Sequence, residues 1–231
     1  MSRRGPAKPP SRLGPLWGRP VGRMLAHVLW RTTVIGKRNV PRKGPVIIIA
    51  NHVGFIDGPV AVGVTPRSAH FIVKTEMFVS MLAVILRASG QIELAHGGRE
   101  ALARGRAVLQ RGRVVGVFPE GSRGSGDAAS LGGGAAWLAL HGDAPVVPLA
   151  LLGTRLTGES VSIWPKPGRR LIAEFGEPFR LDLPDTLKGA ARQKAAEEIV
   201  AERLRAHVHD VDARSPIDLP QDDPLRDGVQ G

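Results

Sequence analysis

A histidine and an aspartate follow directly on an apolar stretch of the chain. The segment VIIIANHVGFIDGPV, residues 46–60, begins with β-branched residues that predict a buried strand and then presents His52 and Asp57. A neutral imidazole is a common general base for a hydroxyl proton. A carboxylate on its other nitrogen fixes the tautomer and stabilises the imidazolium. These two residues are therefore candidates for a catalytic base and its partner.

The spacing of this pair predicts where it must lie. Residues five positions apart in one α-helix point roughly 140° away from each other, because each residue advances about 100°. His52 and Asp57 can therefore meet only if His52 lies on the turn after a strand ending at Ala50. Taken alone, this spacing is a weak signal, and a histidine with a structural role is the plainer explanation.

A second candidate site follows another apolar strand. The segment VVGVFPEGSRG, residues 114–124, opens into a glycine-bearing turn with Glu120, Ser122 and Arg123. The N–H groups of such a turn and a guanidinium can hold a phosphate or a developing oxyanion. A solvated turn with a surface arginine is the alternative. Ser122 is interpreted as a turn hydroxyl, because Glu120 stands where a G-x-S-x-G elbow requires glycine.

Alternating strands and helices must position these residues. Apolar runs predict strands at residues 46–50, 69–74, 90–94, 114–118 and 145–153, and a hairpin at residues 161–179. Helical patterns cover residues 99–112, 133–143 and 189–208. This alternation predicts a single α/β domain in which helices flank a mixed, mostly parallel sheet.

The two ends of the chain differ from this domain. Residues 1–15 combine Pro, Gly and Arg with little to bury, so they are predicted to be a disordered basic tail. The domain is expected to span residues 16–208, and an acidic disordered tail is expected at residues 209–231.

A basic amphipathic helix is predicted at residues 16–34, at the start of the domain. Its apolar residues recur at helical spacing, and its basic residues fall four apart on another side. The apolar set is Val21, Met24, Leu25, Val28 and Leu29. Such a helix fits an anionic membrane surface, and packing on its own domain is an equally good explanation of the pattern.

Composition restricts the possible partners. The 231 residues carry a net charge of +11 and a sequence pI near 11.2, which favours an anionic partner. Aromatic residues are scarce and tyrosine is absent, so a stacking platform for single-stranded nucleic acid is not expected. The absence of cysteine excludes disulfides and thiolate zinc sites, and makes the cytoplasm the default compartment. The apolar run at residues 77–86 falls short of the ~20 residues that span a bilayer.

Together, the motifs resemble those of the 1-acyl-glycerol-3-phosphate (lysophosphatidate) acyltransferases and their glycerolipid acyltransferase relatives. NHVGFID resembles the family's Asn-His-x4-Asp block, and FPEGSR its Phe-Pro-Glu-Gly-Ser/Thr-Arg block. FIVKTEMF, with Lys74, and APVVPLAL, with Pro148, resemble two further blocks. The four blocks occur in the family's order, and the resemblance spans approximately residues 30–180.

The resemblance implies a glycerol-3-phosphate acyltransferase-like fold and an enzyme that acylates the free hydroxyl of lysophosphatidic acid, giving phosphatidic acid. The donor would be acyl-CoA or acyl carrier protein. His52 would be the general base, Asp57 would orient it, and no acyl-enzyme would form. The substrate-binding candidates are Glu120, Gly121, Ser122, Arg123, Lys74, His96, Arg99 and Pro148. No metal or other cofactor and no nucleic acid is implied, and the enzyme would be peripheral, on the cytoplasmic face of the cell membrane.

One block departs from the family pattern. GQIELAH ends in His96, where relatives carry an arginine, and Arg99 follows three residues later. An imidazole with an ordinary pKa of about 6.5 is mostly neutral above pH 7. The departure therefore leaves open the same chemistry on a different lysolipid or other acceptor. A non-catalytic membrane-binding or nucleic-acid-binding domain is a weaker alternative, because such a domain does not need an oriented base.

Overall fold

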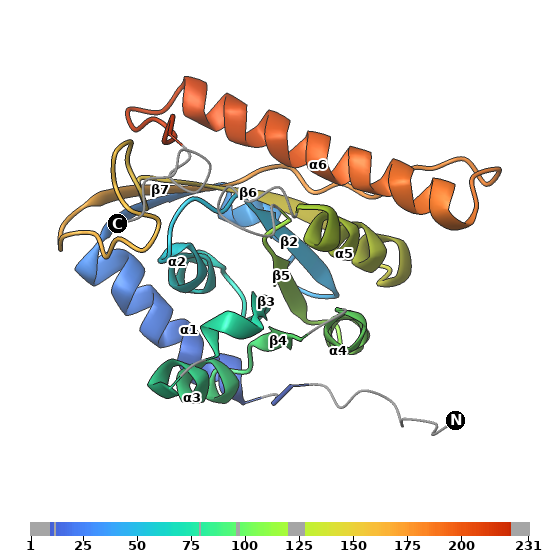
Figure 1. Cartoon of the computed structure of the whole chain (residues 1–231), viewed down its shortest axis with the longest axis horizontal. Coiled ribbons are helices and arrows are strands. Elements are labelled where there is room, and N and C mark those ends of the chain that lie inside the picture. The colour runs from blue at the N-terminus through green and yellow to red at the C-terminus, as the bar shows by residue number, and fades with distance from the viewer. Residues whose placement is uncertain (1–9, 12, 79, 96–97, 120–127, 223–231) are drawn as a thin grey trace.

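The computed structural model describes residues 10–11, 13–78, 80–95, 98–119 and 128–222. Within them, helices flank a seven-stranded sheet of order β1-β7-β6-β2-β5-β3-β4 (Figure 1). The strands are β1 (Arg31–Ile35), β2 (Val46–Ala50), β3 (Ala69–Lys74), β4 (Ile92–Leu94), β5 (Val114–Val117), β6 (Val146–Leu152) and β7 (Arg170–Phe175). The helices are α1 (Gly14–Met24), the π-helical turn η1 (Leu25–Leu29), α2 (Asp57–Val64), α3 (Ser80–Ala88), α4 (Arg99–Leu109), α5 (Ala128–His141) and α6 (Gly189–Ala213); η2 (Lys37–Asn39) and η3 (Thr75–Met77) are short 3₁₀ turns.

Five neighbouring strands run in the same direction. β2 pairs in parallel with β5 and β6, β3 pairs in parallel with β5, and β4 pairs in parallel with β3. β7 is antiparallel to β6, and β1 is parallel to β7. The carboxyl ends of the five parallel strands therefore meet at one edge of the sheet, where open α/β sheets place their sites. This architecture confirms the predicted single α/β domain with a mostly parallel sheet.

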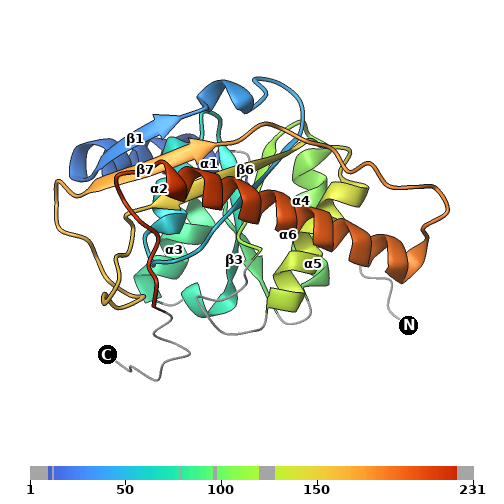
Figure 2. The same ribbon diagram turned by 90° about the horizontal axis from the view of Figure 1, so that it is seen from above.

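Both faces of the sheet are covered, which explains why β2 is an unbroken apolar run. All five of its residues are buried. Ile47 and Ile49 pack in one cluster with residues of α4, α5 and α6, whereas Ile48 packs on the other face with residues of α2 and with Trp30. In Figure 2, α6 lies across the sheet as the outer layer of the first face.

The predicted N-terminal helix ends earlier than residue 34. Helical structure stops at Leu29, and Arg31–Ile35 form β1 in parallel register with β7. Trp30, at the junction, is fully buried. The prediction was wrong here because β-branched residues dominate residues 32–35, and these favour a strand once a neighbouring strand is available.

The predicted hairpin at residues 161–179 does not form. Its second half is β7, but β7 pairs with β6 and β1 rather than with the residues before it. The preceding segment is irregular and contains Pro165 and Pro167, which have no N–H to donate to a ladder.

The acidic C-terminal segment is ordered further than predicted. α6 continues to Ala213, and residues 214–222 fold back on the domain. Val211 is buried, and Leu219 packs against the core. The expectation of disorder from residue 209 is therefore wrong as far as residue 222, because a few apolar side chains anchor the acidic stretch. Residues 223–231 and 1–9, also predicted to be disordered, lie outside the described residues.

Candidate active site

His52 and Asp57 meet at the carboxyl end of β2. The strand ends at Ala50, His52 lies on the following turn, and Asp57 is the first residue of α2. The distance between His52 Nδ1 and Asp57 Oδ2 is 2.8 Å. The Asp57 side chain is fully buried, and the His52 side chain is 19% exposed. The turn between strand and helix thus brings the pair together, as their spacing required.

The Asp57 carboxylate also organises the turn itself. Its Oδ2 accepts the N–H groups of Val53 at 2.7 Å and Gly54 at 2.8 Å, in addition to the contact with His52. Because this oxygen already accepts two backbone N–H groups, it also acts as a hydrogen-bond acceptor toward His52. The proton of the neutral imidazole therefore lies on Nδ1. The basic nitrogen of His52 is then Nε2, which suits a general base.

Asn51 fixes the point at which the turn leaves β2. Its side chain is buried, donates from Nδ2 to the carbonyl of Leu151 at 2.9 Å, and accepts the Leu151 N–H at 2.7 Å. The amide therefore continues the ladder between β2 and β6 by one further rung. No role was predicted for Asn51 from the sequence, although an asparagine between a buried strand and a candidate base was a visible signal.

Phe118 forms one wall of the site. It follows β5, the strand beside β2, and its ring centroid lies 4.6 Å from that of His52. Phe71 supports Phe118 at a centroid distance of 5.6 Å. Gly116 makes room for Phe71, because a Cβ there would lie 2.2 Å from the ring. Apolar contact on one side of the imidazole restricts its orientation beyond the hydrogen bond to Asp57.

The other predicted site residues fall into three groups. Lys74 ends β3 and Arg99 begins α4 after β4, so both stand at the carboxyl edge of the sheet. Pro148 instead lies buried within β6, in register with Ile49, and this placement fits a packing role. Glu120, Gly121, Ser122, Arg123 and His96 lie outside the described residues.

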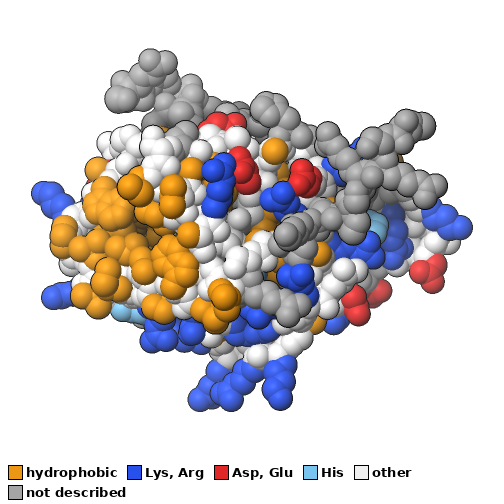
Figure 3. Space-filling model, turned by 90° about the horizontal axis from the view of Figure 1, so that it is seen from below, with side chains coloured by type: hydrophobic (Ala, Val, Ile, Leu, Met, Phe, Trp, Pro, Cys, Tyr) orange, Lys and Arg blue, Asp and Glu red, His pale blue; other side chains and the backbone are white. Residues whose placement is uncertain are grey.

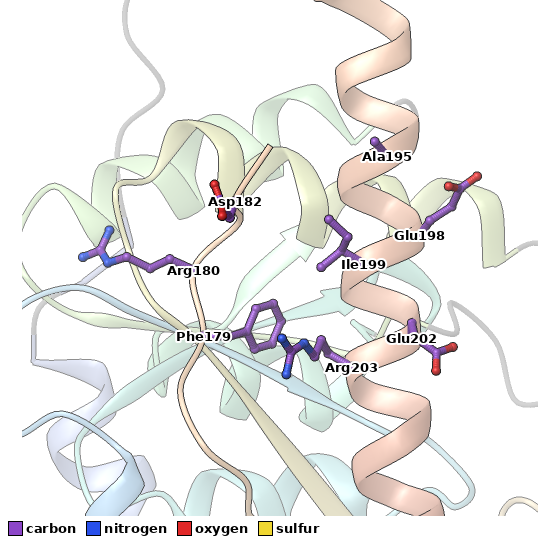
Figure 4. A pocket seen from close by; sticks show the side chains of 8 residues that line it. All are labelled: Phe179, Arg180, Asp182, Ala195, Glu198, Ile199, Glu202 and Arg203. Atoms are coloured by element: carbon purple, nitrogen blue, oxygen red, sulfur yellow. The ribbon is translucent and has the colours of Figure 1, made fainter. Parts of the chain in front are cut away.

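A shallow groove of about 580 Å³ lies away from this pair, between α6 and residues 179–182 (Figure 4). Its lining carries both signs of charge and includes neither His52 nor Asp57. The Arg203 guanidinium lies 5.5 Å from the ring centroid of Phe179. Because the groove lies apart from the His52–Asp57 pair, the candidate active site is placed at the edge of the sheet.

Comparisons with known proteins identify the family of the chain. A family model described as "Acyltransferase" matches residues 31–152, more than half of the 231 residues. Among solved structures, the fold is similar to that of the 1-acyl-sn-glycerophosphate (LPA) acyltransferase PlsC from Thermotoga maritima. The TM-score is 0.64 at 23% identity, covering 87% of this chain and 80% of that chain. A search of curated proteins found no match. At this identity the structural likeness shows a shared fold.

Proposed function

We propose that this chain, which belongs to the acyltransferase family, moves a fatty acyl group from a thioester to the free hydroxyl of lysophosphatidic acid. The product is phosphatidic acid. The observation that carries the proposal is the 2.8 Å contact between His52 Nδ1 and Asp57 Oδ2, at the edge where five parallel strands end. The acceptor is supported by the FPEGSR block and by the fold shared with an LPA acyltransferase.

The proposed reaction is direct transfer. His52 Nε2 removes the proton of the acceptor hydroxyl as the oxygen attacks the thioester carbonyl carbon. The tetrahedral intermediate then expels the thiolate, which takes the proton from the imidazolium. Asp57 stabilises the imidazolium between these two steps. One ester bond forms as one thioester bond breaks, and no acyl-enzyme is needed. The donor is acyl-CoA or acyl carrier protein, and no metal or other cofactor takes part.

A panel of acceptors tests this function. Thiol release from acyl-CoA and from acyl carrier protein is measured with lysophosphatidic acid and with lysolipids that lack a phosphomonoester. We expect the highest kcat/KM with lysophosphatidic acid. A preference for an acceptor without a phosphomonoester would favour the alternative acceptor. No thiol release with any acceptor would support the non-catalytic alternative.

Arg123 is proposed to hold the phosphate of the acceptor. A guanidinium can engage a phosphate through two parallel hydrogen bonds, whereas an ammonium acts as a point charge. We therefore expect Arg123→Lys to raise KM for lysophosphatidic acid by about tenfold, the equivalent of one charge-assisted hydrogen bond of about 1.5 kcal/mol. Steady-state kinetics check this, with Arg192→Lys on α6 as the control. An unchanged KM would remove Arg123 from the phosphate site.

His96 is proposed to contact the same phosphate in place of the arginine of relatives. We expect His96→Arg to lower KM for lysophosphatidic acid at pH 7.5, because the permanent cation replaces an imidazole whose ordinary pKa is about 6.5. In the parent protein, KM should fall as the pH drops toward 6, and the substitution should abolish this dependence. kcat is measured separately from KM, because general-base catalysis can depend on pH in its own right. A KM independent of pH, with no gain from the substitution, would contradict the contact.

We also propose that the enzyme binds an anionic membrane surface, through helices whose large side chains face outward. α1 packs inward through Gly14, Gly18 and Gly22. The approach is close: a Cβ on Gly22 would lie 2.9 Å from the backbone of Gly63 in α2. The small residues face the protein, so Val28 and Met24 are left 79% and 54% exposed.

α3 continues the same surface. The Trp17 indole N–H donates to the carbonyl of Ala88 at 3.0 Å and joins α1 to the end of α3. Met81 and Val84 of α3 are 72% and 62% exposed. The resulting apolar face comprises Leu13, Leu16, Trp17, Val21, Met24, Val28, Met81, Val84 and Ile85. Figure 3 shows a hydrophobic patch over α1 and α3 with Lys and Arg side chains near its border.

An exposed apolar surface with a basic border fits the headgroup boundary of an anionic bilayer. Within the described ranges, no helix has both the length and the apolar character needed to cross a bilayer. The lipid acceptor would then reach the site from the surface on which the protein lies. The cytoplasmic face is proposed as that surface.

Two polar substitutions test this surface. We expect Val28→Gln/Met81→Gln to weaken binding to anionic vesicles by ~10²-fold, because each of the two buried apolar side chains contributes roughly 1.5 kcal/mol. Sedimentation with liposomes measures it. Ala191→Gln/Ala206→Gln, at exposed positions on α6, is the matched control. Deleting residues 1–31 would be a poor test, because it would also remove the buried Trp30. Equal sedimentation of both double variants would contradict the proposal.

A further inference from the structure

A buried arginine touches the turn that carries His52. Arg155 follows β6 and is 4% exposed. Its Nε donates to the carbonyl of Val53, the residue after His52, at 3.0 Å. A charged side chain at this depth requires both hydrogen-bond partners and an opposite charge. Arg155 therefore contacts the turn that carries His52 directly. Its own position depends on the groups that bind its guanidinium.

The peptide groups of Val53 are held from two sides. The Val53 N–H donates to Asp57 Oδ2 at 2.7 Å, and the carbonyl accepts from Arg155. Gly54, the next residue, lies against the segment that contains Arg155. A Cβ on Gly54 would be 3.3 Å from the Thr154 carbonyl oxygen and 3.4 Å from Arg155 Cβ. Asp57 on one side and Arg155 on the other thus fix the backbone just after His52.

The opposite charge comes from the C-terminal segment. Arg155 Nη1 donates to Asp222 Oδ1 at 2.9 Å, and Nη2 donates to the Asp222 carbonyl at 2.8 Å. Asp222 Oδ2 accepts the Gly158 N–H at 3.0 Å. Desolvation is the largest single influence on the pKa of Asp222 and raises it. The hydrogen bond from the Gly158 amide and the interactions with the Arg155 guanidinium together lower the pKa by more, so it lies below its usual value. Asp222 is therefore ionised at neutral pH.

The segment before Asp222 is attached along its length. Arg214 pairs with Glu174 of β7 at 2.5 Å, and the Leu219 N–H donates to Asp212 at 2.6 Å. These contacts lead residues 214–222 from the end of α6 to the loop after β6. This course of the chain brings the Asp222 side chain next to the Arg155 guanidinium.

We propose that Arg155 is a positioning residue for His52, and that Asp222 keeps Arg155 in place. This proposal rests on the proposed role of His52 as general base. Arg155 Nη1 also donates to the Glu159 carbonyl at 3.1 Å. Without the Asp222 carboxylate, the guanidinium would keep its bonds to the Glu159 and Asp222 carbonyls but lose its opposite charge, and its bond to the Val53 carbonyl would loosen. A shift of about 1 Å in a catalytic group can cost up to ~10² in rate. The C-terminal segment thus supports the active site.

Asp222→Asn in the full chain tests the proposal, with Asp218→Asn as the matched control. Asp218 is an exposed residue of the same segment, so the control makes the same change of charge. We expect Asp222→Asn to lower kcat by roughly tenfold or more with little change in KM. It should also lower the hydrogen-exchange protection of the Val53 and Gly54 amides. Asp222→Glu, which keeps the carboxylate, should restore most of both.

The two readouts separate this proposal from the proposed function. Equal kcat and equal amide protection in the Asp222→Asn and Asp218→Asn variants would overturn the proposal. Reduced protection with an unchanged kcat would overturn it as well, because the turn would then move without affecting His52. If the parent protein transfers no acyl group, the proposed function fails. Amide exchange then still decides whether Asp222 holds the turn.

Discussion

His52→Ala is expected to lower kcat for acyl transfer to lysophosphatidic acid by roughly 10² to 10⁴, the usual contribution of a general base. The substitution removes the imidazole that is proposed to take the hydroxyl proton. It should leave the fold intact, because the His52 side chain is 19% exposed and the core of the sheet lies elsewhere. Steady-state thiol release measures the effect.

His209→Ala, at an exposed position near the end of α6, is the control for loss of an imidazole. Its rate should match that of the parent protein. Thermal unfolding of both variants shows whether the fold is preserved. Near-normal transfer by a folded His52→Ala protein would rule out His52 as the base.

Asp57→Asn is expected to lower kcat by about 10² to 10⁴ while the fold survives. The amide can still accept from the Val53 and Gly54 N–H groups through its oxygen. If the amide oxygen faces His52, the imidazolium has no counter-charge. If the amide NH₂ group faces His52 Nδ1, the hydrogen bond favours the wrong tautomer of the imidazole. Asp57 is fully buried, so solvent has little opportunity to compensate.

Asp143→Asn, at an exposed aspartate before β6, is the control for this substitution. The same thiol-release assay is used, and KM is measured to separate binding from turnover. If Asp57→Asn retained more than about a tenth of the parent kcat, well short of the expected loss, orientation of His52 by the carboxylate would not be needed for the reaction.

The centre of the sheet and the His52–Asp57 contact were predictable from the sequence for physical reasons. Strands buried on both faces must be apolar along their length, so β2 and β5 stand out as unbroken runs. The angular advance of a helix then required His52 to precede α2, and the structure places it on that turn. These features depend on residues that are close together in the sequence.

The features that could not be predicted depend on distant partners. The pattern of α1 shows apolar and small residues but does not reveal that Gly22 packs on Gly63 while Val28 faces outward. Strand β1 becomes a strand by pairing with β7, far along the chain. Arg155 and Asp222 are 67 positions apart, and only the folded path of the C-terminal segment brings them together.

The most direct test of the account follows both products of a single reaction in time. The protein is mixed with acyl-CoA and lysophosphatidic acid, and free thiol and phosphatidic acid are measured by rapid quench. Direct transfer predicts that both appear at the same rate, without a burst of thiol ahead of phosphatidic acid, and that neither forms quickly when the acceptor is omitted. A burst of thiol equal to the amount of protein, ahead of phosphatidic acid and with an acyl group attached to the protein, would contradict direct transfer by His52.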